Sequence, residues 1–253
     1  MSQRIAQNVN ALGLTRIPYA EADLIVHLFS DSLGCFAGIA RGLRKNPKRF
    51  GGSLEPFHTL QLSITERATG DLATIKESQL LHPRSGITAD LERMKAAAQA
   101  MLWIKKTLPP RQPEPLVWLA AQDLLERLSA PNHGEELSLQ DYQTALARFG
   151  LRLLDSLGFA LELRHCVSCR RACPEARSAY LNPERGGLIC RACGSGPLLL
   201  QSEFRRQLQL AQQGDLIEKF EDAALALEIV DRTIQAHAGF SPKKKSHKKQ
   251  FQP

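Results

Sequence analysis

Cys166-Val-Ser-Cys169 and Cys190-Arg-Ala-Cys193 are two short cysteine pairs separated by a loop of twenty residues. This spacing is typical of a zinc site. Four thiolates in tetrahedral geometry satisfy a structural zinc ion and leave no coordination position open for catalysis. The loop contains Asn182-Pro183 and Gly186-Gly187, which predicts a strand, a turn and a second strand. We therefore expect a small zinc ribbon at about residues 163–197.

The same four cysteines allow other interpretations. They could be buried thiols or form two disulfides, but nothing in the sequence marks the chain as secreted. A catalytic zinc site usually includes histidine or carboxylate ligands and keeps one position for water. Cys173 lies four residues after Cys169 and outside any second pair, and His165 precedes the first pair. We expect Cys173 to stay outside the metal site and His165 to be a surface histidine.

The composition indicates a soluble globular protein. Of the 253 residues, 43% are hydrophobic and 23% are charged, which is enough apolar material for a substantial core. The net charge of +7 favours a polyanionic partner such as nucleic acid, although a basic protein can be merely soluble. The sequence shows no signal peptide and no run of eighteen apolar residues, so we expect no membrane association. A cytoplasmic location, with reduced thiols, follows as an expectation.

The first 82 residues carry strand patterns. We expect five strands, at about residues 8–17, 23–29, 35–41, 57–65 and 72–80. The fourth alternates well, with Leu60, Leu62 and Ile64 on one face. Five short strands with turn signals between them predict a small barrel. The OB-fold is the five-stranded barrel that commonly binds nucleic acid, and we predict it for residues 1–82.

A basic loop connects the third and fourth predicted strands. Its cations are Arg41, Arg44, Lys45, Lys48 and Arg49, with no acidic residue among them. Such a loop can follow a phosphate backbone and release counterions from it, or it can simply be solvated. We favour DNA binding because a cationic groove is the binding device of OB barrels. Phe36, Phe50 and Phe57 could stack on bases, although a phenylalanine is more often a core residue.

Residues 83–240 change to a helical period. A helix is expected from Thr88 as its N-cap, with an apolar stripe of Leu91, Met94, Ala98, Met101 and Leu108. A second helix starts near Pro113 and is expected to bury Leu116, Leu119, Leu124 and Leu128. A third starts at Ser138, a fourth at Ser202, and a fifth at an Asp215–Glu218 capping box. Trp103 and Trp118 are expected to be core or groove-lining residues.

These patterns together predict an α+β protein of three parts. An OB-fold domain, residues 1–82, precedes a helical domain, residues 83–240, into which the zinc ribbon is inserted. Residues 241–253 form a tail with five lysines and no acidic residue, which predicts disorder. The tail could hold nucleic acid loosely or only aid solubility.

No catalytic motif is evident in the sequence. We find no Walker-type glycine-rich loop, no Gly-x-Gly-x-x-Gly after a strand, no His-Glu-x-x-His and no nucleophile elbow. We therefore expect no enzyme activity and no small-molecule substrate. Two other functions remain open: a zinc-ribbon nucleic-acid-binding factor of transcription or translation, and a nuclease or nucleotide-modifying enzyme that holds its substrate on the barrel.

Several segments follow one another in an order that resembles a known family. Arg41-Gly-Leu-Arg-Lys45 leads on to Leu54-Glu-Pro-Phe57 in the predicted barrel. Ser156-Leu-Gly-Phe159 leads into the first cysteine pair, and Gly186-Gly-Leu-Ile-Cys190 returns to the second. Over residues 1 to about 240 this order resembles the RecO family of bacterial DNA repair proteins.

The resemblance implies a role in recombinational repair by the RecF pathway. Members bind single- and double-stranded DNA, anneal complementary strands and engage the acidic C-terminal tail of the single-strand-binding protein. With RecR they help to load the RecA recombinase onto covered strands, which implies association with the bacterial nucleoid. The matching positions are the five cations of the basic loop for DNA and the four cysteines for zinc. Some members lack the cysteines, so the zinc is expected to be structural.

Overall fold

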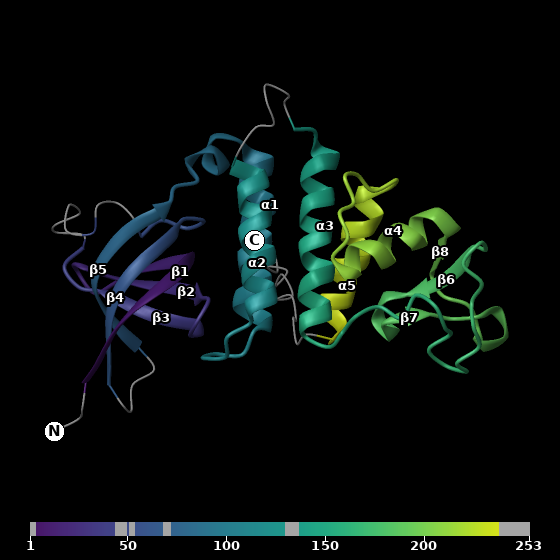
Figure 1. Cartoon of the computed structure of the whole chain (residues 1–253), viewed down its shortest axis with the longest axis horizontal. Helices are drawn as coiled ribbons and strands as arrows, with labels where there is room; N and C mark the ends of the chain where they lie inside the picture. The colour runs from purple at the N-terminus through teal and green to yellow at the C-terminus, as the bar shows by residue number, and fades with distance from the viewer. Residues whose placement is uncertain (1–3, 44–49, 51–53, 68–71, 130–136, 238–253) are drawn as a thin grey trace, which may run out of the picture.

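The computed structural model describes residues 4–43, 50, 54–67, 72–129 and 137–237. The described residues form a β-barrel, a group of helices and a small ribbon, arranged in that order along the long axis (Figure 1). The predicted fold class is confirmed: an N-terminal five-stranded barrel precedes a helical region that carries a ribbon with four clustered cysteines.

The barrel consists of five strands in the order β1-β2-β3-β5-β4. Their bounds are β1 Arg4–Tyr19, β2 Asp23–Ser30, β3 Gly34–Ala40, β4 Thr59–Arg67 and β5 Leu72–His82. Strand β1 is long enough to pair with β4 through its first half and with β2 through its second half. Strands β3 and β5 pair in parallel and complete the closure, which leaves no open sheet edge between them.

Successive side chains of a strand point alternately into the barrel and away from it, and both sides of the barrel carry apolar residues. The interior is filled by residues such as Val26, Leu60, Leu62 and Ile64, all buried. A second set, Leu12, Leu14, Phe29 and Phe57, belongs to the core that the helices share. The helical region therefore packs against the outside of the barrel through a few apolar side chains.

Helix α3 is the centre of the helical region. The helices are α1 Leu91–Thr107, α2 Pro115–Ser129, α3 Leu139–Ser156, α4 Ser202–Gln213 and α5 Ala223–His237. Helix α3 contacts each of the other four. Its predicted start is confirmed, because the Ser138 side chain caps the helix in a reciprocal pair of hydrogen bonds with Asp141.

The predicted start of the first helix is wrong, and its predicted buried face is right only in part. The hydroxyl of Thr88 donates to the carbonyl of Ser85 within a short 3-10 helix, and Asp90 caps α1 by accepting the Arg93 N–H at 2.9 Å. Of the predicted stripe, Met101 and Leu108 are buried, whereas Leu91, Met94 and Ala98 are exposed. The other buried residues of α1 are Ala96, Ala97, Ala100, Trp103 and Ile104.

The predicted start of the last helix is also wrong. No capping box forms at Asp215, and Leu216 is 61% exposed. The chain stays non-helical through Phe220 and up to the start of α5. The Phe220 ring is buried, and the Phe220 backbone N–H donates to the Thr144 hydroxyl of α3 at 3.4 Å. Helix α5 begins at Ala223, where the Asp222 carboxylate accepts the Leu225 N–H at 2.9 Å. Tertiary packing of Phe220 has overridden the local helix signal.

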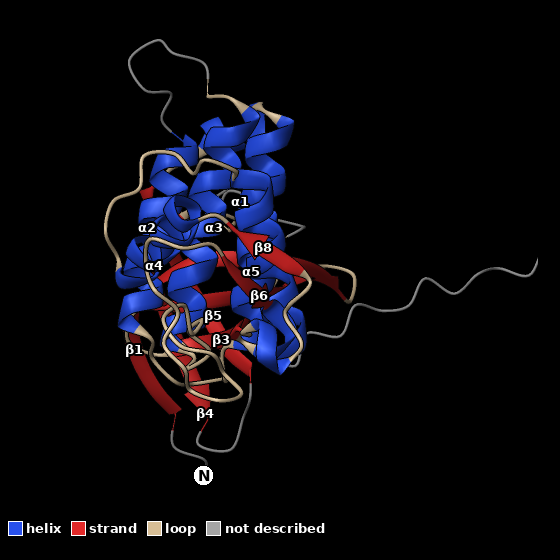
Figure 2. Cartoon of the chain, turned by 90° about the vertical axis from the view of Figure 1, so that its right-hand side faces the viewer, coloured by secondary structure: helices blue, strands red, loops and turns tan. Residues whose placement is uncertain are grey.

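The ribbon is a three-stranded sheet with the order β7-β6-β8. Its strands are β6 Ala179–Asn182, β7 Gly187–Leu188 and β8 Leu198–Leu200. In the view from the ribbon side, β6 and β8 lie in front of the helices (Figure 2). Leu181, Leu188 and Leu200 are buried in the same core as the helices.

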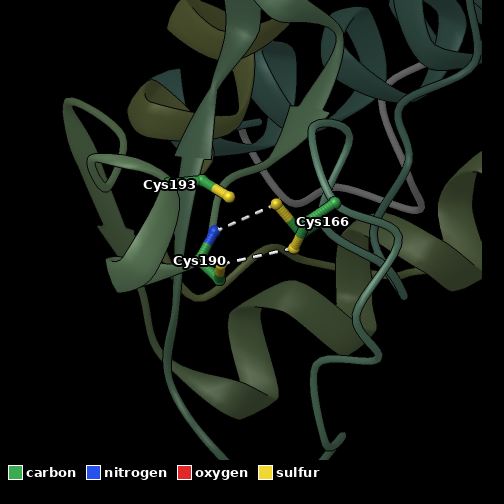
Figure 3. A group of neighbouring side chains, drawn as sticks. Cys166, Cys190 and Cys193 are labelled. Atoms are coloured by element: carbon green, nitrogen blue, oxygen red, sulfur yellow. Dashed lines mark hydrogen bonds between the residues drawn. The ribbon is translucent and has the colours of Figure 1, made fainter.

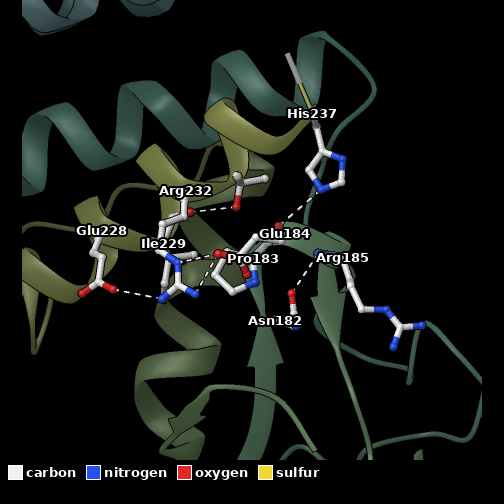
Figure 4. A network of polar contacts seen from close by, with 9 residues as sticks. Asn182, Pro183, Glu184, Arg185, Glu228, Ile229, Arg232 and His237 are labelled. Atoms are coloured by element: carbon white, nitrogen blue, oxygen red, sulfur yellow. Dashed lines mark hydrogen bonds and ion pairs between the residues drawn. The ribbon is translucent and has the colours of Figure 1, made fainter. Parts of the chain in front are cut away.

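A polar network fastens the ribbon to α5 (Figure 4). Arg232 is paired with Glu184 of the ribbon at 2.7 Å and with Glu228, one turn earlier on α5, at 3.1 Å. The His237 Nε2 lies 3.3 Å from the Pro183 carbonyl oxygen. Packing and these contacts together fix the ribbon on the helical region.

Candidate metal centre and nucleic-acid interface

The first cysteine pair sits on a tight hydrogen-bonded turn. The Cys166 N–H donates to the Arg171 carbonyl, and the Arg170 N–H donates back to the Cys166 carbonyl, both at 2.9 Å. Arg170 has a φ of +61°, in the left-handed region, which lets the chain reverse so sharply. The turn directs the side chains of Cys166 and Cys169 toward the second pair.

The second cysteine pair lies on a short 3-10 helix, Arg191–Cys193. Cys190 precedes this helix and its carbonyl accepts the Cys193 N–H at 2.9 Å. Gly194 ends it with a φ of +103°, a conformation that favours glycine. The Val167 N–H donates to the Leu188 carbonyl at 2.8 Å. This backbone hydrogen bond holds the two turns together.

The four sulfur atoms of Cys166, Cys169, Cys190 and Cys193 lie in one cluster. Figure 3 shows Cys166, Cys190 and Cys193 facing one another. All four Sγ atoms lie within 4.8 Å of one another, and the Cys169 and Cys190 sulfurs are 3.7 Å apart. Tetrahedral Zn–S bonds of about 2.3 Å separate their sulfurs by about 3.8 Å. The cluster therefore offers four sulfur ligands close enough together to hold one metal ion.

Hydrogen bonds shift the pKa values of two of these thiols in opposite directions. The Cys190 N–H points at the Cys166 sulfur, 3.3 Å away, and together with the Cys169 N–H it lowers the pKa of Cys166 to about 5. Hydrogen bonds to Cys169 and Cys190 raise the pKa of Cys193 to about 12. Because a metal ion binds thiolates, its binding must release the proton held at Cys193.

The other candidates near the cluster lie outside it. All six cysteines of the chain are free thiols, so the structure contains no disulfide among its described residues. Cys173 is not among the four clustered thiols, and burial raises its pKa. His165 is exposed and lies 3.6 Å from Glu162 rather than beside a sulfur. Both residues occupy the positions that we expected for bystanders.

Only the start of the predicted DNA-binding loop is described. Arg41 is exposed immediately after β3. The following turn is fixed by the Gly42 N–H, which donates to the Asp23 carboxylate at 2.9 Å. Arg44, Lys45, Lys48 and Arg49 lie outside the described residues. Their role in DNA binding stays a prediction.

The predicted phenylalanine stacking platform is not available for bases. Phe36, Phe50 and Phe57 are at most 8% exposed, and each belongs to one of the two apolar cores. The exposed side chain next to Phe36 is Arg111, whose guanidinium lies 5.1 Å from the centre of the ring. Their core role, the commoner one for phenylalanine, is the correct one.

Sequence reasoning missed a groove between α2 and α3. Its volume is about 370 Å³, and Arg127, Arg148 and Arg152 contribute its cations. Leu116 and Leu119, which were expected in the core, are 54% and 63% exposed along its rim. Burial and the neighbouring Arg127 lower the pKa of Arg148. The i,i+4 spacing of Arg148 and Arg152 was a usable signal, but their meeting with α2 could not be foreseen.

Among the described residues, none of the helices has the length and apolar character needed to cross a membrane.

Comparison with known families gives two adjoining matches. Residues 3–84 match the family described as Recombination protein O N terminal, and residues 88–247 match Recombination protein O C terminal. The first covers the barrel, and the second covers the helices and the ribbon.

Individual relatives agree over most of their length. The DNA repair protein RecO of Syntrophotalea carbinolica is 31% identical over 225 residues, which cover 81% of this chain and 84% of the relative. The protein of the same name from Pelobacter propionicus is 28% identical, with 92% of each chain covered. That from Rubrobacter xylanophilus is 33% identical, with 72% and 69% covered. The chain therefore belongs to the RecO family.

Proposed function

We propose that the chain is a recombination mediator in DNA repair. It binds single- and double-stranded DNA, anneals complementary strands and, with RecR, helps to load RecA onto DNA covered by single-strand-binding protein. The observation that carries this proposal is the closed OB-type barrel within a family match that spans both halves of the chain. The work takes place in the bacterial cytoplasm, at the nucleoid.

The proposed mechanism is charge neutralisation. Two DNA strands repel each other through their phosphates, and a cationic surface lowers this repulsion when both strands bind. Base pairing then supplies the sequence specificity, so the protein needs little readout of bases. Arg41 at the end of β3, followed by the cations of residues 44–49, supports such a surface on the barrel. Affinity should fall steeply with salt and depend weakly on sequence.

Zinc is the metal that we propose for the cysteine cluster. Four sulfur ligands within 4.8 Å of one another suit zinc and would leave no open position for a substrate. The ion would therefore hold the ribbon in shape and take no part in annealing. The residues that would bind it are Cys166, Cys169, Cys190 and Cys193.

The groove between α2 and α3 suits the acidic tail of the single-strand-binding protein. Arg127, Arg148 and Arg152 supply positive charge, while Leu116 and Leu119 offer apolar contact to such a peptide. Asp123 and Asp215 also line the groove, and Asp123 is paired with Arg127 at 2.9 Å. Arg152 is paired with Asp155 at 3.5 Å and donates to the Gln212 carbonyl at 3.0 Å, so Arg148 is the arginine that we propose for the acidic groups of the tail.

The decisive experiment is annealing of complementary oligonucleotides coated with single-strand-binding protein, without ATP or divalent metal. We expect the native chain to anneal them and the variant Arg44→Ala/Lys45→Ala/Lys48→Ala to lose most of this activity. Absence of annealing by the native chain would instead favour a zinc-ribbon factor of transcription or translation. A requirement for ATP or metal turnover would favour an enzyme.

A matched control removes the same charge elsewhere. Lys95, Arg206 and Lys219 are exposed cations of the helical region, and each is only paired with a nearby surface acid. The variant Lys95→Ala/Arg206→Ala/Lys219→Ala should anneal like the native chain. Equal loss in both triple variants would show that net charge, rather than the basic loop, governs annealing.

The tail site is tested with a peptide of the acidic C-terminal sequence. In fluorescence anisotropy, Leu119→Ser and Arg148→Gln should each weaken peptide binding about ten-fold. Leu139→Ser is the control, because Leu139 is similarly exposed at 54% but lies outside the groove. Unchanged binding in both groove variants would exclude this location for the tail.

A further inference from the structure

A second cationic cavity lies between the ribbon and α4. Its volume is about 580 Å³, and three arginines line it: Arg177 before β6, Arg191 beside the second cysteine pair, and Arg205 on α4. Tyr180 and Leu199 form part of the same wall. No acidic residue is among the described residues that line the cavity. Its chemistry therefore favours an anionic ligand.

Arg205 provides the most direct indication of that ligand. Its side chain is 1% exposed, and Nη2 donates to the Pro174 carbonyl at 2.7 Å. Nη1 has no hydrogen-bond partner, and no carboxylate of the described residues forms an ion pair with this guanidinium. An unpaired buried charge is costly. An anion in the cavity would offset that cost.

The neighbouring sheet surface is flat and partly apolar. Tyr180 of β6 and Leu199 of β8 are direct partners in the ladder, so their side chains lie on the same face. Leu199 is 50% exposed, and the Arg191 guanidinium lies 5.9 Å from the centre of the Tyr180 ring. An aromatic ring next to arginines is the arrangement that holds a base and its phosphate in single-strand-binding proteins.

We infer that this cavity binds single-stranded DNA, with a backbone phosphate at the three arginines and the adjoining base on Tyr180. The inference rests on the proposed function and adds a second DNA contact to it. An acidic peptide could use the arginines, but it would leave the aromatic wall unused. A zinc ion with four thiolates would carry a net charge of −2 beside the cavity. The three positive charges of the arginines exceed this, so the cavity would stay cationic with the ion bound.

The helices lie between the barrel and the ribbon that lines this cavity (Figure 1). The ribbon therefore presents a DNA contact at one end of the described structure, while the barrel, with Arg41 directly after β3, lies at the other end. One chain could hold a strand at both ends, or hold one strand at each end. Either arrangement increases the time that a strand spends near its complement.

The test measures the affinity for a fluorescent twenty-nucleotide oligothymidine at several salt concentrations. Arg177→Gln/Arg191→Gln should weaken binding several-fold and reduce the slope of log affinity against log salt by about 0.7 for each phosphate that the variant no longer neutralises. Tyr180→Ala should weaken binding roughly ten-fold with the slope unchanged. All three side chains lie at the surface or are partly exposed, so the fold should survive these changes.

Arg164→Gln/Arg206→Gln is the matched control, since both arginines are exposed and neither lines the cavity. It should bind like the native chain. If the native chain binds oligothymidine and the cavity variants bind equally well, the inference fails while the proposed function stands. If the native chain neither binds nor anneals DNA, both fail.

A second arm separates DNA from peptide. An acidic decapeptide labelled in the same way should bind equally to the native chain and to the Arg177→Gln/Arg191→Gln variant. Weakened peptide binding with unchanged oligothymidine binding would identify the cavity as a peptide site and overturn the inference. Arg205→Gln, with circular dichroism to confirm folding, should weaken oligothymidine binding in the same direction as the surface variants.

Discussion

Cys190 contributes twice to the cysteine cluster. Its sulfur is 3.7 Å from the Cys169 sulfur, and its N–H supports the Cys166 sulfur at 3.3 Å. Such N–H contacts orient a ligand and stabilise its thiolate form. The cysteine spacing alone predicted which sulfurs would meet, because the pattern depends only on two local turns. It could not predict which thiol keeps a proton, since the pKa of Cys193 depends on side-chain hydrogen bonds to Cys169 of the opposite turn and to Cys190.

Replacement of Cys190 by serine tests the structural role of the metal. We expect Cys190→Ser to lose its zinc and to lower the free energy of unfolding by roughly several kcal/mol, because metal binding contributes folding energy. Zinc content and thermal unfolding are the measurements. Cys173→Ser is the control and should keep both. A Cys190→Ser protein that is metal-free and as stable as the native chain would refute a structural role.

His58 links the pH of the medium to stability at the junction of barrel and helices. Its Nδ1 accepts the Arg84 N–H at 3.0 Å, which requires the neutral ring. Burial, and then the charge of Arg84, lower the pKa of His58 below 6.5, while Glu55 opposes them. The unfolded chain therefore binds a proton more readily than the folded chain.

The resulting pH dependence has a definite sign. The contribution of His58 is fully present above pH 6.5 and is lost as the pH falls below it, until the folded ring also becomes protonated. His27, whose pKa burial also lowers, acts in the same direction. In urea unfolding between pH 8 and 5, His58→Asn should show a shallower loss of stability than the native chain. His82→Asn, on an exposed residue, should retain the native slope.

At the scale of elements, the sequence predicted which strands and helices form better than it predicted which face of a helix is buried. The five strands and the start of α3 were predictable because alternation and a serine cap are local signals. The buried face of α1 was predicted only at Met101, because alanines and Trp103 make most of it, while Leu91 and Met94 are exposed. Small residues are needed where helices pack closely, and a search for large apolar residues overlooks them.

Gly150 permits the close packing of α3. A Cβ at this position would lie 2.3 Å from a Val230 methyl of α5 and 3.0 Å from the Trp103 ring of α1. Alanine would favour the helix by about 1 kcal/mol, but forcing a methyl group into a packed core costs about 1–3 kcal/mol. We therefore expect Gly150→Ala to be destabilising overall.

A double-mutant cycle with Val230→Ala measures that contact in chemical unfolding. Gly150→Ala should cost less in the Val230→Ala background than in the native chain, because the shortened side chain leaves room for the new methyl group. Equal costs in the two backgrounds would show that α3 and α5 are not in contact at Gly150.

At the scale of the whole molecule, the sequence predicted the parts better than the surfaces between them. The barrel, the helices and the cysteine cluster each follow from contiguous patterns. The α2–α3 groove and the cavity at α4 do not, because Arg148 and Arg205 meet their neighbours only after the helices pack. The division into domains at residues 82 and 240 stays a prediction, since apolar residues of the barrel and the helices share one core.

Arg84 is a buried polar link between the barrel and the helices. Its guanidinium donates to the Phe57 carbonyl at 3.0 Å and to the Thr59 hydroxyl at 2.8 Å, both on the barrel side. It also donates to the Gln122 side chain of α2 at 2.5 Å. Arg84→Met should leave the Phe57 carbonyl without this donor, while Thr59 still donates to Gln122 at 2.9 Å. We expect it to lower the free energy of unfolding by about 1–3 kcal/mol.

The control for Arg84→Met is Arg16→Gln, which removes an exposed ion pair with Glu55 and should cost at most about 1 kcal/mol. Tryptophan fluorescence follows the junction, because Trp118 of α2 packs edge-on against Phe29 of the barrel at 5.7 Å. In Arg84→Met we expect this signal to change at lower urea than the helical circular dichroism, since the junction opens first. Coincident transitions with native stability would show that Arg84 does not hold the two parts together.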